Sequence, residues 1–258
     1  MKRFVLNFKK YKFLLKQLTV KEIKLKYRNS ILGILWTFLE PLLTMIVLTL
    51  VFSKLLGKGT GDFPVYILSG RLIFSFFSGS TQKALKSVRA HAGMIKKVYV
   101  PKYMYPVSAV FSNYIMFLIS LIVLAVVACV RHVYPTVRVL YAIIPLVAIL
   151  FVSLGIGLIL SAISVFFKDL EYLWTIVTMI VMYASAIFYD VDSVVTEKNA
   201  WIFKFNPVYA CIDMFRSAIF GDAIDLWCVV YACVFAAVSC VVGVVTFVKT
   251  QDKFILYL

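Results

Sequence analysis

The chain has 258 residues, of which 63% are hydrophobic and only 15% are charged, and its mean hydropathy is +0.96. This composition excludes a water-soluble globular domain, whose surface needs more charge. Apolar runs of about 20 or more residues also exclude a β-barrel, so we expect an all-α integral membrane protein.

The formal charge is +15, from 27 Lys and Arg against 12 Asp and Glu. A basic chain can bind nucleic acid. Here the cations lie beside apolar runs, which instead indicates contact with the anionic headgroups of membrane lipids. The five cysteines form no CxxC pair, and we expect them to be packing residues, with neither disulfides nor a metal site.

Residues 1–30 are predicted to be cytoplasmic or interfacial, because they are too basic for a cleavable signal peptide. In residues 1–17, apolar side chains on one helical face predict a first surface helix. Thr19-x-x-Glu22 is typical of a capping box, so a second helix is expected to begin at Thr19. Its alternating apolar and basic residues predict an interfacial amphipathic helix with snorkelling lysines.

Six apolar segments predict six spans within a transmembrane domain at 31–258. Their approximate bounds are 31–56, 64–83, 103–130, 139–167, 172–189 and 226–248. The first is longer than the ~30 Å apolar core of a bilayer requires, so it should tilt, kink or protrude.

Two further apolar pieces, 201–205 and 209–220, are too short to span and are separated by Asn206-Pro207. We expect them to be short re-entrant helices. Most of the Lys and Arg lie in segments that a six-span chain places on the side of its N-terminus. The positive-inside rule therefore predicts that both termini are cytoplasmic.

The sequence shows no phosphate-binding loop, no HExxH, no Ser-His-Asp set and only two histidines, so we do not expect an enzyme. The ionisable residues inside predicted spans are Glu40 and Arg71. A lone acid at this depth costs about 2.5–3.5 kcal/mol, so Glu40 should face a cavity or a partner. Pro41 removes the backbone hydrogen bond to Thr37 and should deform the helix. Two interpretations stay open, a structural Glu40–Arg71 ion pair and a gate or conduit residue.

Residues 83–102 form the only substantial cytoplasmic loop between spans, and they contain six cations and no acid. Residues 87–98 are expected to form a short helix. This segment is either an ordinary positive-inside loop or a docking helix for a cytoplasmic partner. Aromatic residues make up 16% of the chain, and most are expected to face lipid, with a minority lining a channel where they stack on sugar rings.

Three motifs resemble those of ABC-2 type permeases, in the branch that exports O-antigen, capsular polysaccharide and teichoic acid. The first resembles the entry to that branch's first span, the second the turn before its fifth span, and the third its outer re-entrant region. They are Tyr27-Arg28-Asn29-Ser30-x-Leu32-Gly33-x-Leu35-Trp36-x3-Glu40-Pro41, Phe167-Lys168-Asp169-Leu170, and Asn206-Pro207 followed by Asp213-Met214-Phe215-Arg216. The resemblance extends over essentially the whole chain.

The resemblance implies a permease subunit in a bacterial plasma (inner) membrane that forms a homodimer. It implies two copies of a separate cytoplasmic ATPase, which bind the ATP and Mg, and no cofactor in this chain. The cargo would be a lipid-linked glycan. ATP-driven closure of the ATPases would push on the helices at 19–30 and 87–98 and separate the first and fifth spans of the two copies.

On this basis we assign candidate residues to three sites. The ATPase-docking residues are Glu22, Lys26, Arg28, Arg89, His91, Lys96 and Lys97. The gate or channel residues are Trp36, Glu40, Pro41, Arg71, Phe74, Phe77, Tyr183 and Phe188. The outer exit residues are Asn206, Pro207 and Arg216.

Three other functions stay open. The first is an ABC-2 exporter of drugs or small lipids. The second is a membrane assembly protein that transports nothing, which would purify without an ATPase. The third is a membrane glycosyl- or acyltransferase, which the lack of an acid or histidine cluster disfavours.

Overall fold

A computed structural model describes residues 11–56, 62–97, 100–134, 136–189 and 200–257, which form helices and no strand. The helices in chain order are α2 (Lys12–Tyr27), η1 (Gly33–Leu35), α3 (Trp36–Leu56), α4 (Phe63–Ala90), α5 (Ala92–Ile95), α6 (Met104–Val130), η2 (Val137–Ala142), α7 (Ile143–Ser164), α8 (Leu170–Tyr183), α9 (Ala200–Lys204), α10 (Pro207–Phe220), α11 (Leu226–Thr250), η4 (Gln251–Lys253) and α12 (Phe254–Tyr257).

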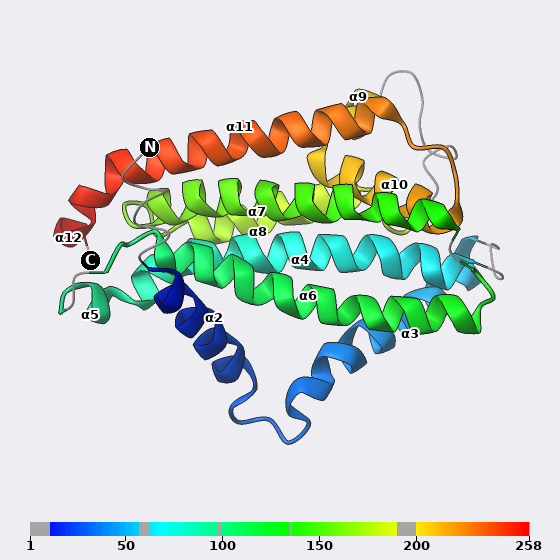
Figure 1. Cartoon of the computed structure of the whole chain (residues 1–258), viewed down its shortest axis with the longest axis horizontal. Helices are drawn as coiled ribbons and strands as arrows, with labels where there is room; N and C mark the ends of the chain where they lie inside the picture. The colour runs from blue at the N-terminus through cyan, green and yellow to red at the C-terminus, as the bar shows by residue number, and fades with distance from the viewer. Residues whose placement is uncertain (1–10, 57–61, 98–99, 135, 190–199, 258) are drawn as a thin grey trace.

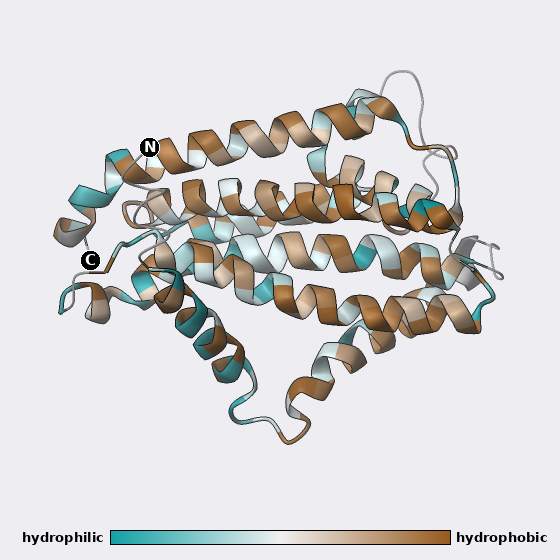
Figure 2. Cartoon of the chain, in the orientation of Figure 1, coloured by the Kyte–Doolittle hydropathy of each residue, from teal (hydrophilic) through white to brown (hydrophobic). Residues whose placement is uncertain are grey.

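Long helices α4, α6, α7 and α11 run side by side and form the body of the molecule (Figure 1). The most extensive contacts join α7 to α11, and α4 to both α6 and α7. Hydrophobic residues dominate α6, α7 and α11, whereas hydrophilic residues gather on α2 (Figure 2). The all-α membrane fold expected from composition is therefore confirmed.

Within the part of the chain that the structure describes, four helical segments are long and apolar enough to cross a membrane, namely Gly33–Phe52, Met104–Val130, Val137–Ser164 and Leu226–Lys253. They correspond to the first, third, fourth and sixth predicted spans. Helix α4 has 28 residues but carries polar side chains, and α8 has only 14 residues, about 21 Å of helix. The count of six spans therefore stays a prediction.

The N-terminal helix differs from the expectation. The predicted start at Thr19 is wrong, because one helix, α2, runs from Lys12 through Thr19 to Tyr27. Leu15, Leu18 and Thr19 are buried, and α2 packs on α6. This packing carries the helix through the sequence that resembles a capping box, so no break separates the two predicted surface helices at Thr19. Residues 1–10 of the first one lie outside the described residues.

The first predicted span also begins late, at Trp36 instead of residue 31. Gly33 adopts φ +50°, a left-handed conformation that favours glycine, and its N–H donates to Ser30 Oγ (3.2 Å). These features break the helix between α2 and α3. The two helices form a V whose apex, residues 28–35, projects away from the body (Figure 1).

Residues 83–102, predicted to be a cytoplasmic loop, contain less independent helix than expected. Helix α4 continues past residue 83 to Ala90, because Ser87 and Val88 extend its buried face. A break at His91 follows, and α5 is only four residues long. The predicted helix at 87–98 is therefore wrong, and residues 98–99 lie outside the described residues.

The fifth predicted span, 172–189, contains α8 and then a turn at 184–189. The two short helices expected before the last span are present as α9 and α10, although α10 begins at Pro207 instead of residue 209. Their outer, re-entrant position stays a prediction. Asn206 caps the N-terminus of α10. Pro207 occupies the first position of α10, where the backbone N–H of any other residue would have no partner within the helix and proline has none. Helix α10 packs on α4, α7 and α11.

Candidate functional site

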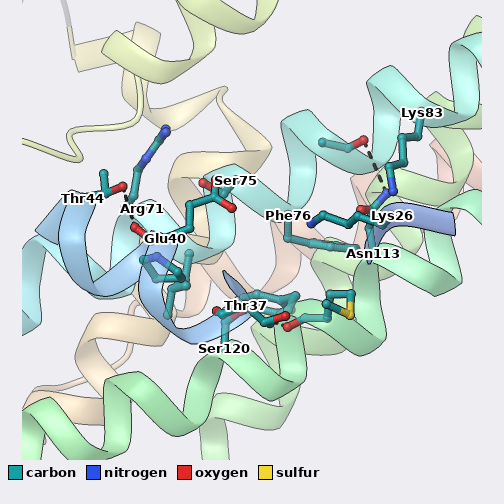
Figure 3. Close-up of a pocket in the computed structure, with 15 residues that line it drawn as sticks. Lys26, Thr37, Glu40, Thr44, Arg71, Ser75, Phe76, Lys83, Asn113 and Ser120 are labelled. Carbon is teal, nitrogen blue, oxygen red and sulfur yellow. Dashed lines mark hydrogen bonds between the residues drawn. The ribbon is translucent and has the colours of Figure 1, made fainter. Parts of the chain in front are cut away.

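A polar cavity of about 250 Å³ lies between the C-terminal end of α2 and helices α3, α4 and α6. Its charged lining residues are Lys26, Glu40, Arg71 and Lys83. Lys26 and Lys83 lie toward one end, and Glu40 and Arg71 toward the other (Figure 3). Three cations therefore share the cavity with one carboxylate. The remaining polar lining comes from Thr37, Thr44, Ser75, Asn113 and Ser120.

Pro41 deforms α3 less than expected, because α6 compensates for the hydrogen bond that proline cannot make. A residue other than proline at position 41 would donate its N–H to the Thr37 carbonyl. In the structure the Ser120 hydroxyl of α6 shares its one proton between that carbonyl (3.3 Å) and the Met116 carbonyl of its own helix (2.9 Å). Helix α3 stays continuous from Trp36 to Leu56. Pro41 therefore marks the point where α3 is tied to α6 through a side chain.

Glu40 and Arg71 line the same cavity without an ion pair between them among the described residues. Their charges interact only at longer range. Arg71 Nη1 instead points toward Met182 Sδ on α8 (4.0 Å), and its guanidinium lies 5.9 Å from the Phe74 ring. The expected structural ion pair is therefore absent from this protomer, and Glu40 is exposed. The interpretation of Glu40 as a gate or conduit residue stays a prediction.

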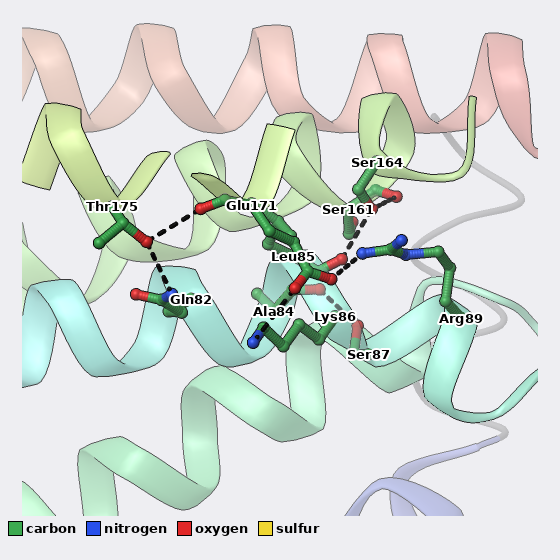
Figure 4. A network of polar contacts seen from close by, with 10 residues as sticks. All are labelled: Gln82, Ala84, Leu85, Lys86, Ser87, Arg89, Ser161, Ser164, Glu171 and Thr175. Atoms are coloured by element: carbon green, nitrogen blue, oxygen red, sulfur yellow. Dashed lines mark hydrogen bonds and ion pairs between the residues drawn. The ribbon is translucent and has the colours of Figure 1, made fainter. Parts of the chain in front are cut away.

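A second cluster joins the C-terminal half of α4 to the start of α8 (Figure 4). Glu171 forms ion pairs with Arg89 and, at 3.2 Å, with Lys86. One turn further along α8, Thr175 accepts a hydrogen bond from Gln82 (3.2 Å). Helix α8 buries only Thr178, so these polar contacts supply much of what holds it to the body.

Another contact joins α2 to the end of α4. The Glu22 carboxylate lies 3.6 Å from His91 Nε2, and the His91 ring stacks on Tyr105 at 4.7 Å between centroids. His91 Nδ1 lies 2.8 Å from the Ser87 carbonyl oxygen. Glu22 and His91 thus contact each other, so neither is fully available to a docked protein. Arg28, Lys96 and Lys97 are exposed, whereas Arg89 is half-buried against Glu171.

The C-terminal end of the chain lies beside Lys102, at the end of the loop between α4 and α6. Lys102 Nζ donates to the Gln251 carbonyl (2.6 Å) and lies 5.7 Å from the Phe254 ring centroid. Burial lowers the pKa of Lys102, and the nearby Asp252 opposes this shift. Since Phe254 is fully buried, α12 is fixed against the body.

Arg216, assigned to the outer exit, is buried with its guanidinium turned inward. It donates to the carbonyls of Ala186 (2.9 Å), Ile187 (3.2 Å) and Tyr66 (3.2 Å), and lies 3.4 Å from the Tyr66 ring centroid. In this arrangement Arg216 joins the turn after α8 to α4. The assignment of Arg216 to an outer exit stays a prediction.

Asn206 holds the same turn from the other side. Its Nδ2 donates to the Ala184 carbonyl and to Ser185 Oγ, both at 3.0 Å, while its Oδ1 accepts from the backbone N–H of Val208 and Tyr209. Asn206 therefore caps α10 and fixes the turn after α8. Pro207 is half-buried at the first position of α10.

The aromatic residues assigned to a channel divide into two groups. Phe74, Phe77 and Phe188 are buried in the protomer, and Phe188 stacks on Phe52 at 5.2 Å between centroids. Their placement favours packing within one chain. Trp36 and Tyr183 are exposed, so these two stay available to line a pathway.

Several residues of these sites were not selected from the sequence. Lys83 and Glu171 were regarded as residues of a loop and of a turn, and Asn113, Ser120 and Thr37 as ordinary members of spans. The available signal was the helical spacing of Ser75, Gly79 and Lys83, which places them on one face of α4.

Comparison with known proteins gives a consistent result. The family model described as ABC-2 type transporter matches residues 14–220. The chain is 28% identical over 243 residues to the O-antigen export system permease protein RfbA of Klebsiella pneumoniae, covering 93% of each chain. It is 29% identical over 217 residues to the protein of that name from Myxococcus xanthus, covering 83% of each. It is 22% identical over 217 residues to the polysialic acid transport protein KpsM of Escherichia coli, again covering 83% of each.

Proposed function

Since the chain belongs to the ABC-2 type transporter family, we propose that it is the permease subunit of an ABC exporter for a lipid-linked cell-surface polysaccharide. The cargo is of the O-antigen, capsule or teichoic acid type, and it moves outward across the bacterial plasma membrane. The observation that carries this proposal is the match along 93% of both chains to a permease named for O-antigen export. A separate cytoplasmic ATPase binds the ATP and Mg and supplies the energy.

The permease works as a homodimer in this proposal. Helix α3 exposes Leu43, Val47 and Leu50, and α8 exposes Ile176 and Ile180. Only 6% of the apolar window of α3 is buried within the protomer. A second copy covering these faces would place α3 and α8 of both protomers around a shared pathway. Such a pathway explains how a helix containing Glu40 is tolerated in a membrane.

Two copies of the ATPase dock on the cytoplasmic end, with both termini of the permease on that side. The exposed Arg28, Lys96 and Lys97 supply the charged contact surface. A push on α5 is transmitted directly to α4, because only the break at His91 separates them. From α4 the push reaches α8 through Glu171. The movement of α8 and α3 then opens the pathway.

The test is affinity purification of the full chain from its native membranes, followed by an ATPase assay in nanodiscs. We expect a cytoplasmic ATPase to co-purify, and a lipid-linked glycan from the same cells to stimulate it. If small hydrophobic drugs stimulate the ATPase and the glycan does not, the cargo is a small hydrophobic molecule and the polysaccharide assignment is wrong. If no ATPase co-purifies, the exporter assignment itself fails.

A variant pair tests the docking surface. We expect Lys96→Ala combined with Lys97→Ala to reduce ATPase co-purification. The matched control is Lys12→Ala, which removes an exposed lysine at the N-terminal end of α2. If ATPase coupling survives loss of both loop lysines, the docking assignment is wrong.

A further inference from the structure

We propose that the cavity between α2, α3, α4 and α6 is a binding site for a lipid-borne phosphate or diphosphate group. Lys26, which is exposed, and Lys83, which is half-buried, line this cavity from different helices, and neither amino group has a hydrogen-bond or ion-pair partner among the described residues. The Lys26 amino group lies 5.4 Å from the centroid of the neighbouring Tyr27 ring, which leaves its positive charge unneutralised. Each charge acts unfavourably on the other. An anion between them replaces this repulsion with two attractive contacts.

The neighbouring carboxylates do not neutralise the pair. Glu22 acts on Lys83 at longer range, but the group within 4 Å of its carboxylate is the His91 imidazole. Glu40 lies toward the other end of the cavity, with Arg71 (Figure 3). The cavity therefore has an excess of cations at the end nearest to α2, where a ligand with two or more negative charges is favoured.

The two lysines are the main phosphate ligands of this site. Lysine ammonium groups are common phosphate donors. Ser75 shares the face of α4 with Lys83, but eight positions separate them, about 12 Å of helix, and Figure 3 places Ser75 with Glu40 and Arg71 at the other end of the cavity. The volume of about 250 Å³ leaves room for a phosphate or diphosphate.

The apex next to the cavity indicates that the phosphate is attached to a lipid. Ile31, Leu32, Ile34 and Leu35 are exposed at the apex of the V, directly between Lys26 and the cavity residue Thr37 in sequence. Exposed apolar residues beside a cationic cavity match a ligand with an apolar chain and an anionic head. Two sources carry such a head, the lipid end of the transported glycan and the bulk anionic phospholipids. Assigning the ligand to the cargo rests on the proposed function, whereas the anion site does not.

The test measures binding to the full chain in phosphatidylcholine nanodiscs by native mass spectrometry, with farnesyl diphosphate as the probe. We expect Lys26→Ala and Lys83→Ala each to weaken binding about tenfold or more, and Lys26→Arg to keep most of it. The matched control is Lys24→Ala, which removes an exposed lysine of the same helix that does not line the cavity. Glu40→Gln should tighten binding several-fold, because it removes the one carboxylate of the cavity.

Competition identifies the source. If nanodiscs containing phosphatidylglycerol abolish probe binding, the site takes bulk phospholipid headgroups; if binding persists, it takes the lipid diphosphate. Both results support an anion site. The proposal is overturned if the probe does not bind, or if it binds equally to wild type, Lys26→Ala and Lys83→Ala proteins with unchanged melting temperatures. Loss of the anion site would leave the exporter assignment intact, since ATPase co-purification tests that separately.

Discussion

Close packing of α7 on α11 gives the sharpest prediction about stability. A Cβ added at Gly155 would lie 2.3 Å from the carbonyl carbon of Ser239 and 2.6 Å from the backbone nitrogen of Cys240. These blocking atoms belong to the backbone of α11 and cannot rotate away. Small residues at such crossings let two membrane helices approach closely.

Gly155→Ala therefore forces α7 and α11 apart by about 1 Å, the difference between 2.3 Å and the 3.4 Å of an ordinary contact. A gap of this size forfeits up to half of the dispersion energy of the neighbouring contacts. Overpacking costs about 1–3 kcal/mol, and we expect the upper end because the obstacle is backbone. The assay is reversible unfolding by denaturant in detergent micelles, compared with wild type.

Gly79→Ala is the matched control, because this helical glycine has no heavy atom within 4 Å of an added Cβ. It should be neutral or stabilising by up to about 1 kcal/mol through helix propensity. Gly243→Ala adds a methyl group at the same helix crossing from the α11 side, where the added Cβ lies 2.5 Å from the Gly155 carbonyl oxygen. Its cost should match that of Gly155→Ala, and the double variant should cost less than the sum. A Gly155→Ala protein as stable as the Gly79→Ala protein would refute this account of the crossing.

Three further predictions concern the polar contacts. Glu171→Gln should cost no more than about 1 kcal/mol of stability, since the ion pairs are partly exposed, yet it should reduce glycan-stimulated ATP hydrolysis. Combining Glu171→Arg with Arg89→Glu should restore this stimulation. A full response from the Glu171→Gln protein would exclude the role proposed for Glu171. Arg216→Lys should lower the melting temperature through a loss of about 1–3 kcal/mol of stability, because one ammonium group cannot reproduce the guanidinium's three carbonyl contacts and its ring contact. An unchanged melting temperature would contradict the view that Arg216 joins the turn after α8 to α4. Asn206→Ala should lose about 1–2 kcal/mol of stability in the same assay. Asn206→Asp should lose less, because Asp keeps the cap of α10 while it loses the hydrogen bond to the Ala184 carbonyl. Equal losses of stability in the two variants would show that capping is unimportant.

Local sequence determined most of the helices. The apolar runs predicted α6, α7 and α11 within a few residues, because an α-helix satisfies its own backbone hydrogen bonds and depends mainly on nearby residues. The Asn206-Pro207 pair also predicted the start of α10 within two residues. The family resemblance followed from motifs that are contiguous or closely spaced in sequence.

Tertiary packing decided what each polar group does. Burial of Leu18 on α6 carried α2 through an apparent start signal at Thr19. Ser120 satisfied the carbonyl that Pro41 leaves free, although 79 positions separate them in sequence. The Arg216 guanidinium donates to three carbonyls inside the chain, whereas the family resemblance alone assigned Arg216 to the outer exit.

The juxtaposition of Lys26 and Lys83 likewise depends on how α2 folds back against α4 and α6. Helical periodicity assigns a residue to a face of its own helix, but it does not reveal which helix that face meets. That information exists only once the V of α2 and α3 is formed. The sequence by itself therefore determined a helical membrane permease, and the tertiary structure decided where its charges come together.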